Sequence, residues 1–141
     1  MIRVSFQDVE EFIVIKKFKG LELGASKLHV ISVFGEPLEH EPQKGKNYEI
    51  CSYGVLQIYL LNRMVVGFTF DYQKIHYYRE PIEYTPIDQE IILRYLNNYQ
   101  IEYSENLLLK TYDGNTVSTN DGISLGFVGD KLVAFGILSK N

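Results

Sequence analysis

The side chains best suited to chemistry lie in one polar segment, residues 71–80. Its sequence, Asp-Tyr-Gln-Lys-Ile-His-Tyr-Tyr-Arg-Glu, places the imidazole of His76 among carboxylates and phenols. A histidine beside a carboxylate could act as a general acid or base, because its pKa lies near neutrality. No spacing rule brings these groups together, and tyrosines in a loop commonly pack their rings and expose their hydroxyls. We therefore expect an exposed tyrosine-rich surface here and treat catalysis at His76 as the alternative.

The other nucleophilic and metal-binding side chains are scattered. No two of the three histidines have the spacing of ligands on one helical turn. The single Cys51 excludes an internal disulfide and lies in an apolar run, where a thiol behaves as a small hydrophobic group. The motifs Gly-x-Ser-x-Gly and Gly-x-x-x-x-Gly-Lys-Ser are absent. The sequence thus predicts no metal, no other cofactor and no enzymatic activity.

Carboxylates and tyrosines gather between residues 71 and 90, where Lys74 and Arg79 are among the few basic residues. Tyrosine offers a large contact area with few torsions to freeze, and dispersed carboxylates speed the encounter with a cationic partner. The alternative is a solvated loop followed by a helix N-terminus, where acidic residues interact well with the dipole. We expect a protein partner to contact Asp71, Tyr72, His76, Tyr77, Tyr78, Glu80, Glu83 and Tyr84.

Composition narrows the class of protein. A chain of 141 residues, 45% hydrophobic and 23% charged, predicts a single domain over residues 1–141. The formal charge of −4, without any basic run, argues against nucleic acid as a partner. No apolar run reaches the roughly 20 residues of a membrane span, and the N-terminus lacks a signal-peptide profile. These features predict a cytoplasmic protein without a membrane partner, and they leave the oligomeric state open.

Periodicity predicts the elements of the first half. Alternation at Ile2, Val4 and Phe6 and the β-branched run 12–15 predict two strands. A helix is expected over 26–34, with Ser26 as its N-cap and Gly35 at its end. Residues 36–47 read as a loop, and 48–52, 55–61 and 64–70 as a meander of three strands.

The second half begins with an exposed connection over 71–84. Thr85 as a cap and Pro86 at the first helical position predict a helix ending near residue 98. Strands are expected over 107–112, 116–119, 123–127 and 132–138, separated by turns that contain glycine.

The strands of the two halves share an apolar pattern. An offset of 67 residues carries Leu56, Ile58, Leu60, Val66, Phe68 and Phe70 onto Ile123, Leu125, Phe127, Val133, Phe135 and Ile137. This favours two helix-plus-hairpin half-repeats, 21–70 and 85–138, although two unrelated hairpins would give the same pattern. Both interpretations predict an α+β fold with two helices on one face of a mainly antiparallel sheet.

Three short stretches carry a family resemblance: Leu-Gly-Ala-Ser at 23–26, Phe-Gly-Glu-Pro at 34–37 and Tyr-Gly-Val-Leu-Gln-Ile at 53–58. They resemble the helix-hairpin repeat of β-lactamase-inhibitor-like domains and the small immunity proteins of bacterial polymorphic-toxin and contact-dependent growth inhibition systems. The absence of paired cysteines favours the immunity proteins. The resemblance implies a cytosolic protein that binds a cognate, basic toxin domain, for example a nuclease, and blocks its active site or substrate groove.

Two other function classes stay open at this point. A small enzyme or small-molecule binder would need a pocket around His76, with catalytic residues gathered from distant positions. A scaffold or assembly domain could instead dimerise through an exposed sheet edge.

Overall fold

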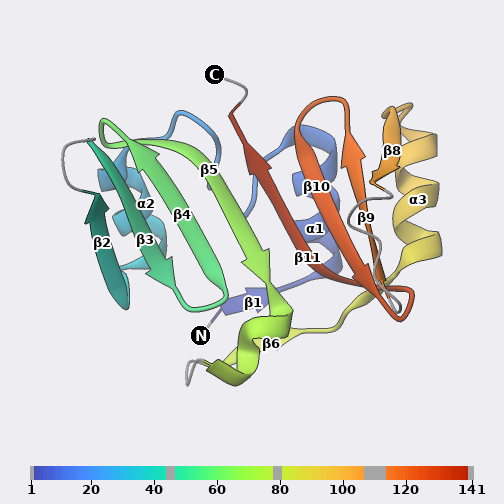
Figure 1. The fold of residues 1–141 in the computed structure, drawn as a ribbon, viewed down its shortest axis with the longest axis horizontal. Helices are drawn as coiled ribbons and strands as arrows, with labels where there is room; N and C mark the ends of the chain where they lie inside the picture. The colour runs from blue at the N-terminus through green and yellow to red at the C-terminus, as the bar shows by residue number, and fades with distance from the viewer. Residues whose placement is uncertain (1, 44–46, 78–80, 107–113, 140–141) are drawn as a thin grey trace.

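One long antiparallel sheet with helices on one face dominates the computed structural model, which describes residues 2–43, 47–77, 81–106 and 114–139. The strands run in the order β2-β3-β4-β5-β11-β10-β9-β8 (Figure 1). Their bounds are β2 (Glu39–Gln43), β3 (Tyr48–Tyr53), β4 (Leu56–Leu61), β5 (Met64–Asp71), β8 (Tyr103–Asn106), β9 (Gly114–Thr119), β10 (Ile123–Val128) and β11 (Lys131–Leu138). The protein is therefore α+β, as the sequence predicts.

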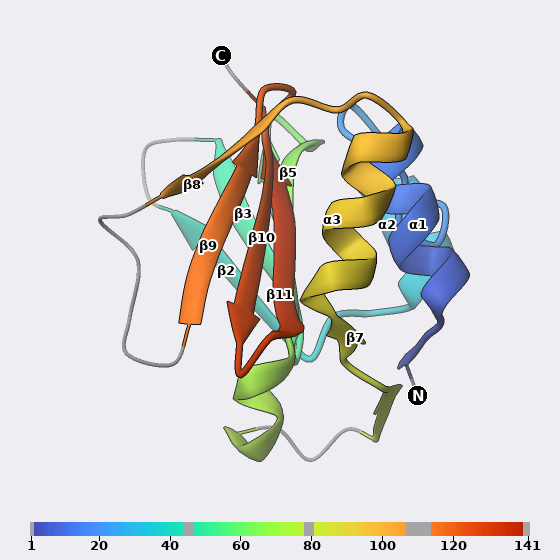
Figure 2. The same cartoon turned by 90° about the vertical axis from the view of Figure 1, so that its right-hand side faces the viewer.

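Three helices, α1 (Phe6–Ile15), α2 (Lys27–Phe34) and α3 (Gln89–Asn98), lie on the same side of this sheet (Figure 2). Below them, β1 (Ile2–Val4) pairs in parallel with β6 (Ile82–Tyr84), and β7 (Ile87–Asp88) pairs with β11. A 3₁₀ helix, η1 (Tyr72–Tyr77), follows β5. Among the described residues, the side of the sheet opposite the three helices carries no helix, and we call it the open face.

The prediction of a strand over residues 12–15 is wrong, because these residues end α1. Ser5 and Asp8 form a capping box: the Ser5 hydroxyl accepts from the Asp8 amide at 3.1 Å, and the Asp8 carboxylate accepts from the Ser5 amide at 2.9 Å. Because the capping box starts a helix at Phe6, the β-branched run continues that helix instead of forming a strand. The side chains of Phe12 and Ile13 are fully buried. The sheet therefore carries three helices instead of the expected two.

The prediction for α2 is confirmed. The Ser26 hydroxyl accepts from the His29 amide at 3.1 Å, and Gly35 ends the helix with a φ of 79°.

The helix start predicted at Thr85 is wrong. The chain stays extended through Ile87, which pairs with Leu132 of β11, and α3 begins only at Gln89. Pairing of residues 87–88 with β11 thus outweighs the local helix-start signal of Thr85 followed by Pro86. The end of the helix at Asn98 agrees with the prediction.

The meander of β3, β4 and β5 and the strands β9, β10 and β11 are confirmed. Residues 36–47, expected as a loop, contain β2, and β8 was not expected at all. Both are polar edge strands, which lack the apolar alternation that reveals a strand in sequence. The strand predicted over 107–112 lies outside the described residues.

An aromatic cluster fills the core where the two halves of the sheet meet. Phe135 of β11 contacts Phe70 of β5, with ring centroids 4.9 Å apart. From the helix layer, Phe12 and Phe18 lie 5.2 and 5.4 Å from the same ring. Helix α1 and the turn after it therefore seal the seam between β5 and β11.

The two halves occupy mirrored places in the sheet, since β2 to β5 run inward from one edge and β8 to β11 from the other. The offset of 67 also maps the bulge between Tyr59 and Leu60 onto that between Gly126 and Phe127. It maps the turn 62–63, both residues with positive φ, onto the turn 129–130, which has the same property. At the seam, the pair Phe68↔Ile137 maps onto Phe70↔Phe135. These correspondences support the internal duplication, which stays a prediction.

Candidate functional site

The segment predicted to bind a partner divides into exposed, buried and undescribed parts. Asp71 and Tyr72 are half-buried where β5 passes into η1, and Glu83 is exposed on β6. The backbone of His76 and Tyr77 belongs to η1, but nothing is described of their side chains, and Tyr78 and Glu80 lie outside the described residues. A pocket around His76 therefore stays a prediction.

Tyr84 belongs to the core instead of a contact surface. It is 7% exposed, and its hydroxyl donates to the Leu132 carbonyl at 2.6 Å. Its ring meets those of Phe70 and Tyr72 edge to face. Burial raises the pKa of Tyr84 to about 12. Tyr84 thus joins the strand β6 to β11, and a docked partner would not reach it.

The described acidic residues of this segment and its flanks, Asp71, Glu83 and Asp88, already have partners within the chain. Glu83 forms an ion pair with Arg3 at 3.4 Å, and Asp88 forms one with Lys131. The Asp71 carboxylate accepts from the Gln73 amide at 3.1 Å. Internal pairing reduces the charge that this region could offer to a partner.

The open face of the sheet presents a surface that the sequence interpretation did not identify. Residues that pair directly across two neighbouring strands point to the same face of the sheet. Leu56, Ile58 and Leu60 of β4, and the residues paired with them, point toward the helices, and these three side chains are fully buried. The alternate residues of the same strands therefore point away from the helices. In the first half, the outward-facing side chains nearest the turn 62–63 are apolar, while Ser52, Gln57 and Thr69 further along are polar. Together with Leu138 of the adjoining β11, these apolar side chains form what we call the apolar face: Tyr48, Ile50, Tyr59, Leu61, Met64 and Leu138.

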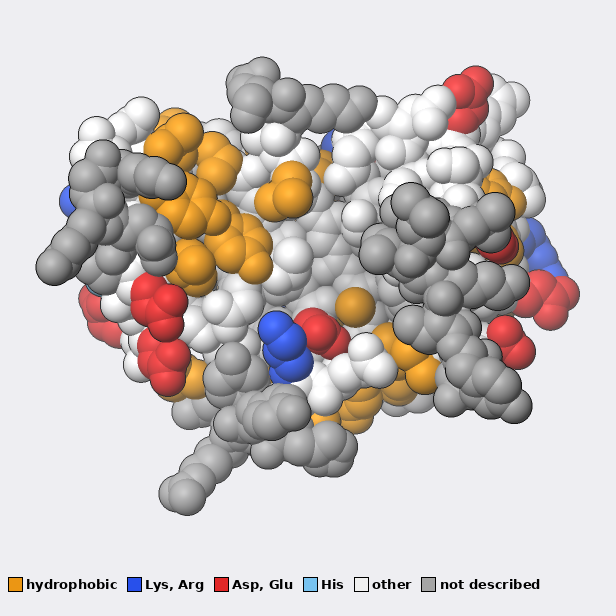
Figure 3. Space-filling view, in the orientation of Figure 1, with side chains coloured by type: hydrophobic (Ala, Val, Ile, Leu, Met, Phe, Trp, Pro, Cys, Tyr) orange, Lys and Arg blue, Asp and Glu red, His pale blue; other side chains and the backbone are white. Residues whose placement is uncertain are grey.

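These side chains remain accessible to solvent. Leu61 and Met64 are each 44% exposed and Leu138 is 60% exposed, while the other three are half-buried. Figure 3 shows a contiguous apolar patch over the strands of the first half. A contiguous patch of exposed large apolar side chains is typical of a binding site.

The two tyrosines of the apolar face have different surroundings. The Tyr59 hydroxyl lies 3.3 Å from the Thr69 hydroxyl. Burial, and then the neighbouring Tyr59, raise the pKa of Tyr48 above its usual value. The phenol of Tyr48 is thus neutral at physiological pH and can enter an interface without the cost of burying a charge.

An acidic border runs along one side of the apolar face. Glu39 and Glu41 of β2 are exposed and stand opposite Ser52 and Ile50, on the open side of the sheet. Figure 3 shows acidic side chains beside the patch. The same edge strand contains Pro42, which cannot donate a backbone hydrogen bond. Charge and proline discourage strand addition at this edge, so the face is the better contact surface.

The second half of the sheet provides an internal comparison. Its register reproduces that of the first half, with Thr116↔Gly126 and Gly114↔Val128 in the places of Ile50↔Tyr59 and Tyr48↔Leu61. The residues equivalent to the apolar face are small, polar or charged with one exception: Gly114, Thr116, Gly126, Val128, Lys131 and Asp71. The strand framework therefore does not require large apolar residues at these positions.

Cys51 lies beside a charged cluster but is not set up as a nucleophile. Glu49 accepts from Lys27 Nζ at 3.0 Å and from His40 Nε2 at 2.5 Å, between β3 and the start of α2. Although burial acts upward, the hydrogen bonds from His40 and Lys27 hold the pKa of Glu49 below its usual value. Cys51 stands opposite His40 in register but is fully buried, and burial raises the pKa of its thiol.

Metal binding finds no support in the described ranges, where no three His, Cys, Asp or Glu side chains come together as possible ligands. In the same part of the chain, no helix is long and apolar enough to cross a bilayer.

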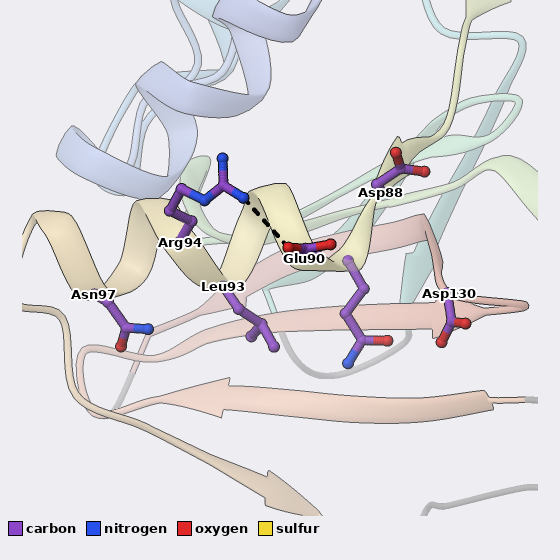
Figure 4. Close-up of a pocket in the computed structure, with 7 residues that line it drawn as sticks. Asp88, Glu90, Leu93, Arg94, Asn97 and Asp130 are labelled. Atoms are coloured by element: carbon purple, nitrogen blue, oxygen red, sulfur yellow. Dashed lines mark hydrogen bonds and ion pairs between the residues drawn. The ribbon is translucent and has the colours of Figure 1, made fainter.

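A wide hollow of about 630 Å³ runs along α3 (Figure 4). Leu93 and Asn97 point from the helix toward the strands of the second half, and Arg94 reaches Glu90 at 3.3 Å. The hollow is lined mainly by polar and charged side chains, two of them joined in this ion pair, and its geometry indicates no reaction.

No family model matches the sequence, and no curated protein matches it. A solved structure with the same fold is an extracellular protein containing a SCP domain from Bacillus anthracis str. Ames. It superposes with a TM-score of 0.53 and 17% sequence identity. The alignment covers 84% of this chain but 44% of that protein, so the chain spans less than half of its length. At this identity the likeness concerns the fold alone.

Proposed function

We propose that the chain is a non-catalytic, cytoplasmic binding protein that neutralises a basic protein partner by covering it with the apolar face. The difference between the two halves carries this proposal. Both halves build the same strand register, yet among the described residues the large apolar side chains of the open face gather over the strands of the first half and the adjoining Leu138 of β11, whereas the equivalent positions of the second half hold one apolar residue, Val128. Because folding does not require them, binding accounts for their presence.

The charge of the molecule favours a basic partner over a second copy of the chain. Glu39 and Glu41 border the apolar face, and the formal charge is −4. Two copies would bring like charges together, whereas a basic protein would be attracted to both the border and the whole molecule. The resemblance to immunity proteins implies such a partner, namely a cognate toxin domain with a basic substrate groove.

A stable interface usually buries about 800 Å² per partner, so the apolar face would form its centre and the surrounding polar surface its rim. Tyr48 and Tyr59 lie within the apolar face as aromatic anchors, and Glu39 and Glu41 lie at its rim. In such interfaces, buried aromatic residues carry most of the affinity, and rim charges mainly accelerate association. Inhibition by occlusion needs no catalytic residue in this chain.

The experiment is a calorimetric titration against a panel of purified basic nuclease domains of bacterial toxins, starting with any domain encoded beside this chain. We expect one saturable complex in which nuclease activity is blocked and the association rate falls as salt is raised. Failure of every domain would contradict the toxin assignment. A complex whose association rate ignores salt would contradict the role of the acidic border.

Two variants at equivalent positions then test the apolar face. Leu61 and Val128 each precede the two-residue turn of their hairpin and share the open side of the sheet. We expect Leu61→Asp to weaken the complex by roughly tenfold or more, as for a residue near the centre of an interface, and Val128→Asp to change it less than about twofold. Equal effects of the two variants would contradict the proposal.

A further inference from the structure

A second hollow, which is mainly apolar, lies on the helix side of the first half, where α2 ends. It has a volume of about 320 Å³, at the lower end of the range for small-molecule sites. It lies between the end of α2, the link to β2, the end of β3 and the strand β1. Most of its lining is apolar or aromatic: Ile2, Val33, Phe34, Leu38 and Tyr53.

Folding does not explain this lining. Val33 is 40% exposed and Leu38 is 50% exposed, so both leave apolar surface in water. The second half has a hollow at the equivalent place, where α3 ends and the chain enters β8, and its lining is mainly polar: Asn97, Gln100, Glu102 and Asn120, beside Ile101 and Tyr103. Glu102 precedes β8 as Leu38 precedes β2. The same architecture is thus lined mainly by polar side chains in the second half and mainly by apolar ones in the first.

The aromatic wall of the hollow is fixed in advance. The Tyr53 hydroxyl donates to the Gly35 carbonyl at 2.8 Å, and the Tyr53 ring lies 5.5 Å from that of Phe34. Burial, followed by the nearby Cys51 and Glu36, raises the pKa of Tyr53 to about 12, so the phenol is neutral. A wall that is already ordered lowers the entropic cost of binding.

The charges at the opening are unbalanced. Lys19 forms an ion pair with Asp8 at 3.4 Å, which offsets its positive charge. Glu36 is exposed at the opening, and within the described part of the chain no hydrogen bond or ion pair of its carboxylate is found. The opening therefore offers a free carboxylate beside an apolar cavity.

We propose that this hollow is a binding site for a small organic cation, with an apolar or aromatic body against Phe34, Leu38 and Tyr53 and a protonated amine beside Glu36. The site is separate from the apolar face, since it lies on the opposite side of the sheet. It is independent of any protein partner, so the two proposals stand or fall separately.

The test is an NMR titration of the ¹⁵N-labelled chain with phenylbutylamine, with phenylbutanol and phenylbutyrate as matched probes. We expect saturable shifts at the amides of Val33, Leu38 and Tyr53. The amine should bind roughly threefold tighter than the alcohol, as for one solvent-exposed ion pair, and the carboxylate should bind most weakly.

Three variants separate charge from shape. Glu36→Gln should abolish the preference for amine over alcohol and leave the affinity for the alcohol unchanged. Leu38→Ser should weaken both probes, and Glu102→Gln in the equivalent polar hollow should weaken neither. Absence of saturable shifts, equal affinity for amine and alcohol, or shifts confined to the apolar face would overturn the proposal. An unchanged melting temperature of each variant guards against misfolding.

Discussion

Two glycines on neighbouring strands mark the close approach of β5 to β11. A Cβ atom on Gly136 would lie 2.6 Å from the Phe68 carbonyl oxygen, and one on Gly67 would lie 2.9 Å from the Ile137 carbonyl oxygen. Both neighbours are backbone atoms that cannot turn aside. The seam between the two halves therefore depends on residues without side chains.

Replacement of Gly136 tests this dependence. Gly136→Ala should lower the free energy of unfolding by about 2 kcal/mol, because the strands must separate to admit the methyl group. Gly126→Ala is the matched control, since its nearest contact would be the Ala134 side chain at 3.3 Å, and it should cost less than about 1 kcal/mol. Urea denaturation of both variants measures the difference, and equal losses would contradict the account of the seam.

The charged cluster at Glu49 makes a prediction about pH. Its pKa is lower in the folded chain than the usual 4.5, because Lys27 and His40 hydrogen-bond its ionised form against the opposing effect of burial. A carboxyl group with a lowered pKa stabilises the fold above its unfolded pKa, and this stability is lost as pH falls through the folded pKa. Wild type should therefore lose more unfolding free energy between neutral pH and about pH 3 than Glu49→Gln. Denaturation at the two pH values measures this, and parallel losses would refute it.

At the level of residues, the sequence interpretation found an acidic, tyrosine-bearing segment but not the apolar face. Tyr84 and Tyr72 pack in or against the core, which a list of residue types cannot reveal. The signal for the apolar face was present in Ile58–Leu61, a run that is apolar at both phases of a strand. Ile58 and Leu60 point into the core, whereas Tyr59 and Leu61 point to the open face, where only a second molecule could cover them.

At the level of elements, the sequence predicted a helix correctly where it marked both the start and the end of that helix. Ser26 and Gly35 bound a helix that the sequence predicted correctly. The capping box at Ser5 outweighed four β-branched or aromatic residues further along, and pairing with β11 outweighed the proline near Thr85. Edge strands such as β2 carry no apolar alternation, and only their neighbours in the sheet define them.

Substitution of the two candidate caps distinguishes the observed helix starts from the predicted one. Ser5→Ala should cost about 1 kcal/mol of unfolding free energy, since it leaves the Asp8 amide without its acceptor. Thr85→Ala should cost less than about 0.5 kcal/mol, because Thr85 is exposed and precedes an extended segment. Thermal denaturation followed by circular dichroism compares them, and a larger loss for Thr85→Ala would favour the sequence-based start.

At the scale of the whole molecule, two similar halves meet at a seam sealed by α1, and they differ in what they present. Among the described residues, the first half carries mainly apolar residues on part of the open face and in the hollow behind it, and the second half carries mainly polar or small ones at the equivalent places. The hydrophobic periodicity of the sequence was enough to predict the α+β class. The difference between the halves could be seen only from the strand register, which shows which positions of the two halves are equivalent.

The central proposal is that the apolar face covers another protein, and hydroxyl-radical footprinting of the chain, alone and with a toxin domain that binds it in the calorimetric panel, tests it most directly. Met64 and Tyr59 on the apolar face should lose reactivity in the complex, while Tyr99, which is 47% exposed on the helix side, should keep it. Unchanged reactivity of Met64 and Tyr59, together with protection of Tyr99, would contradict the claim.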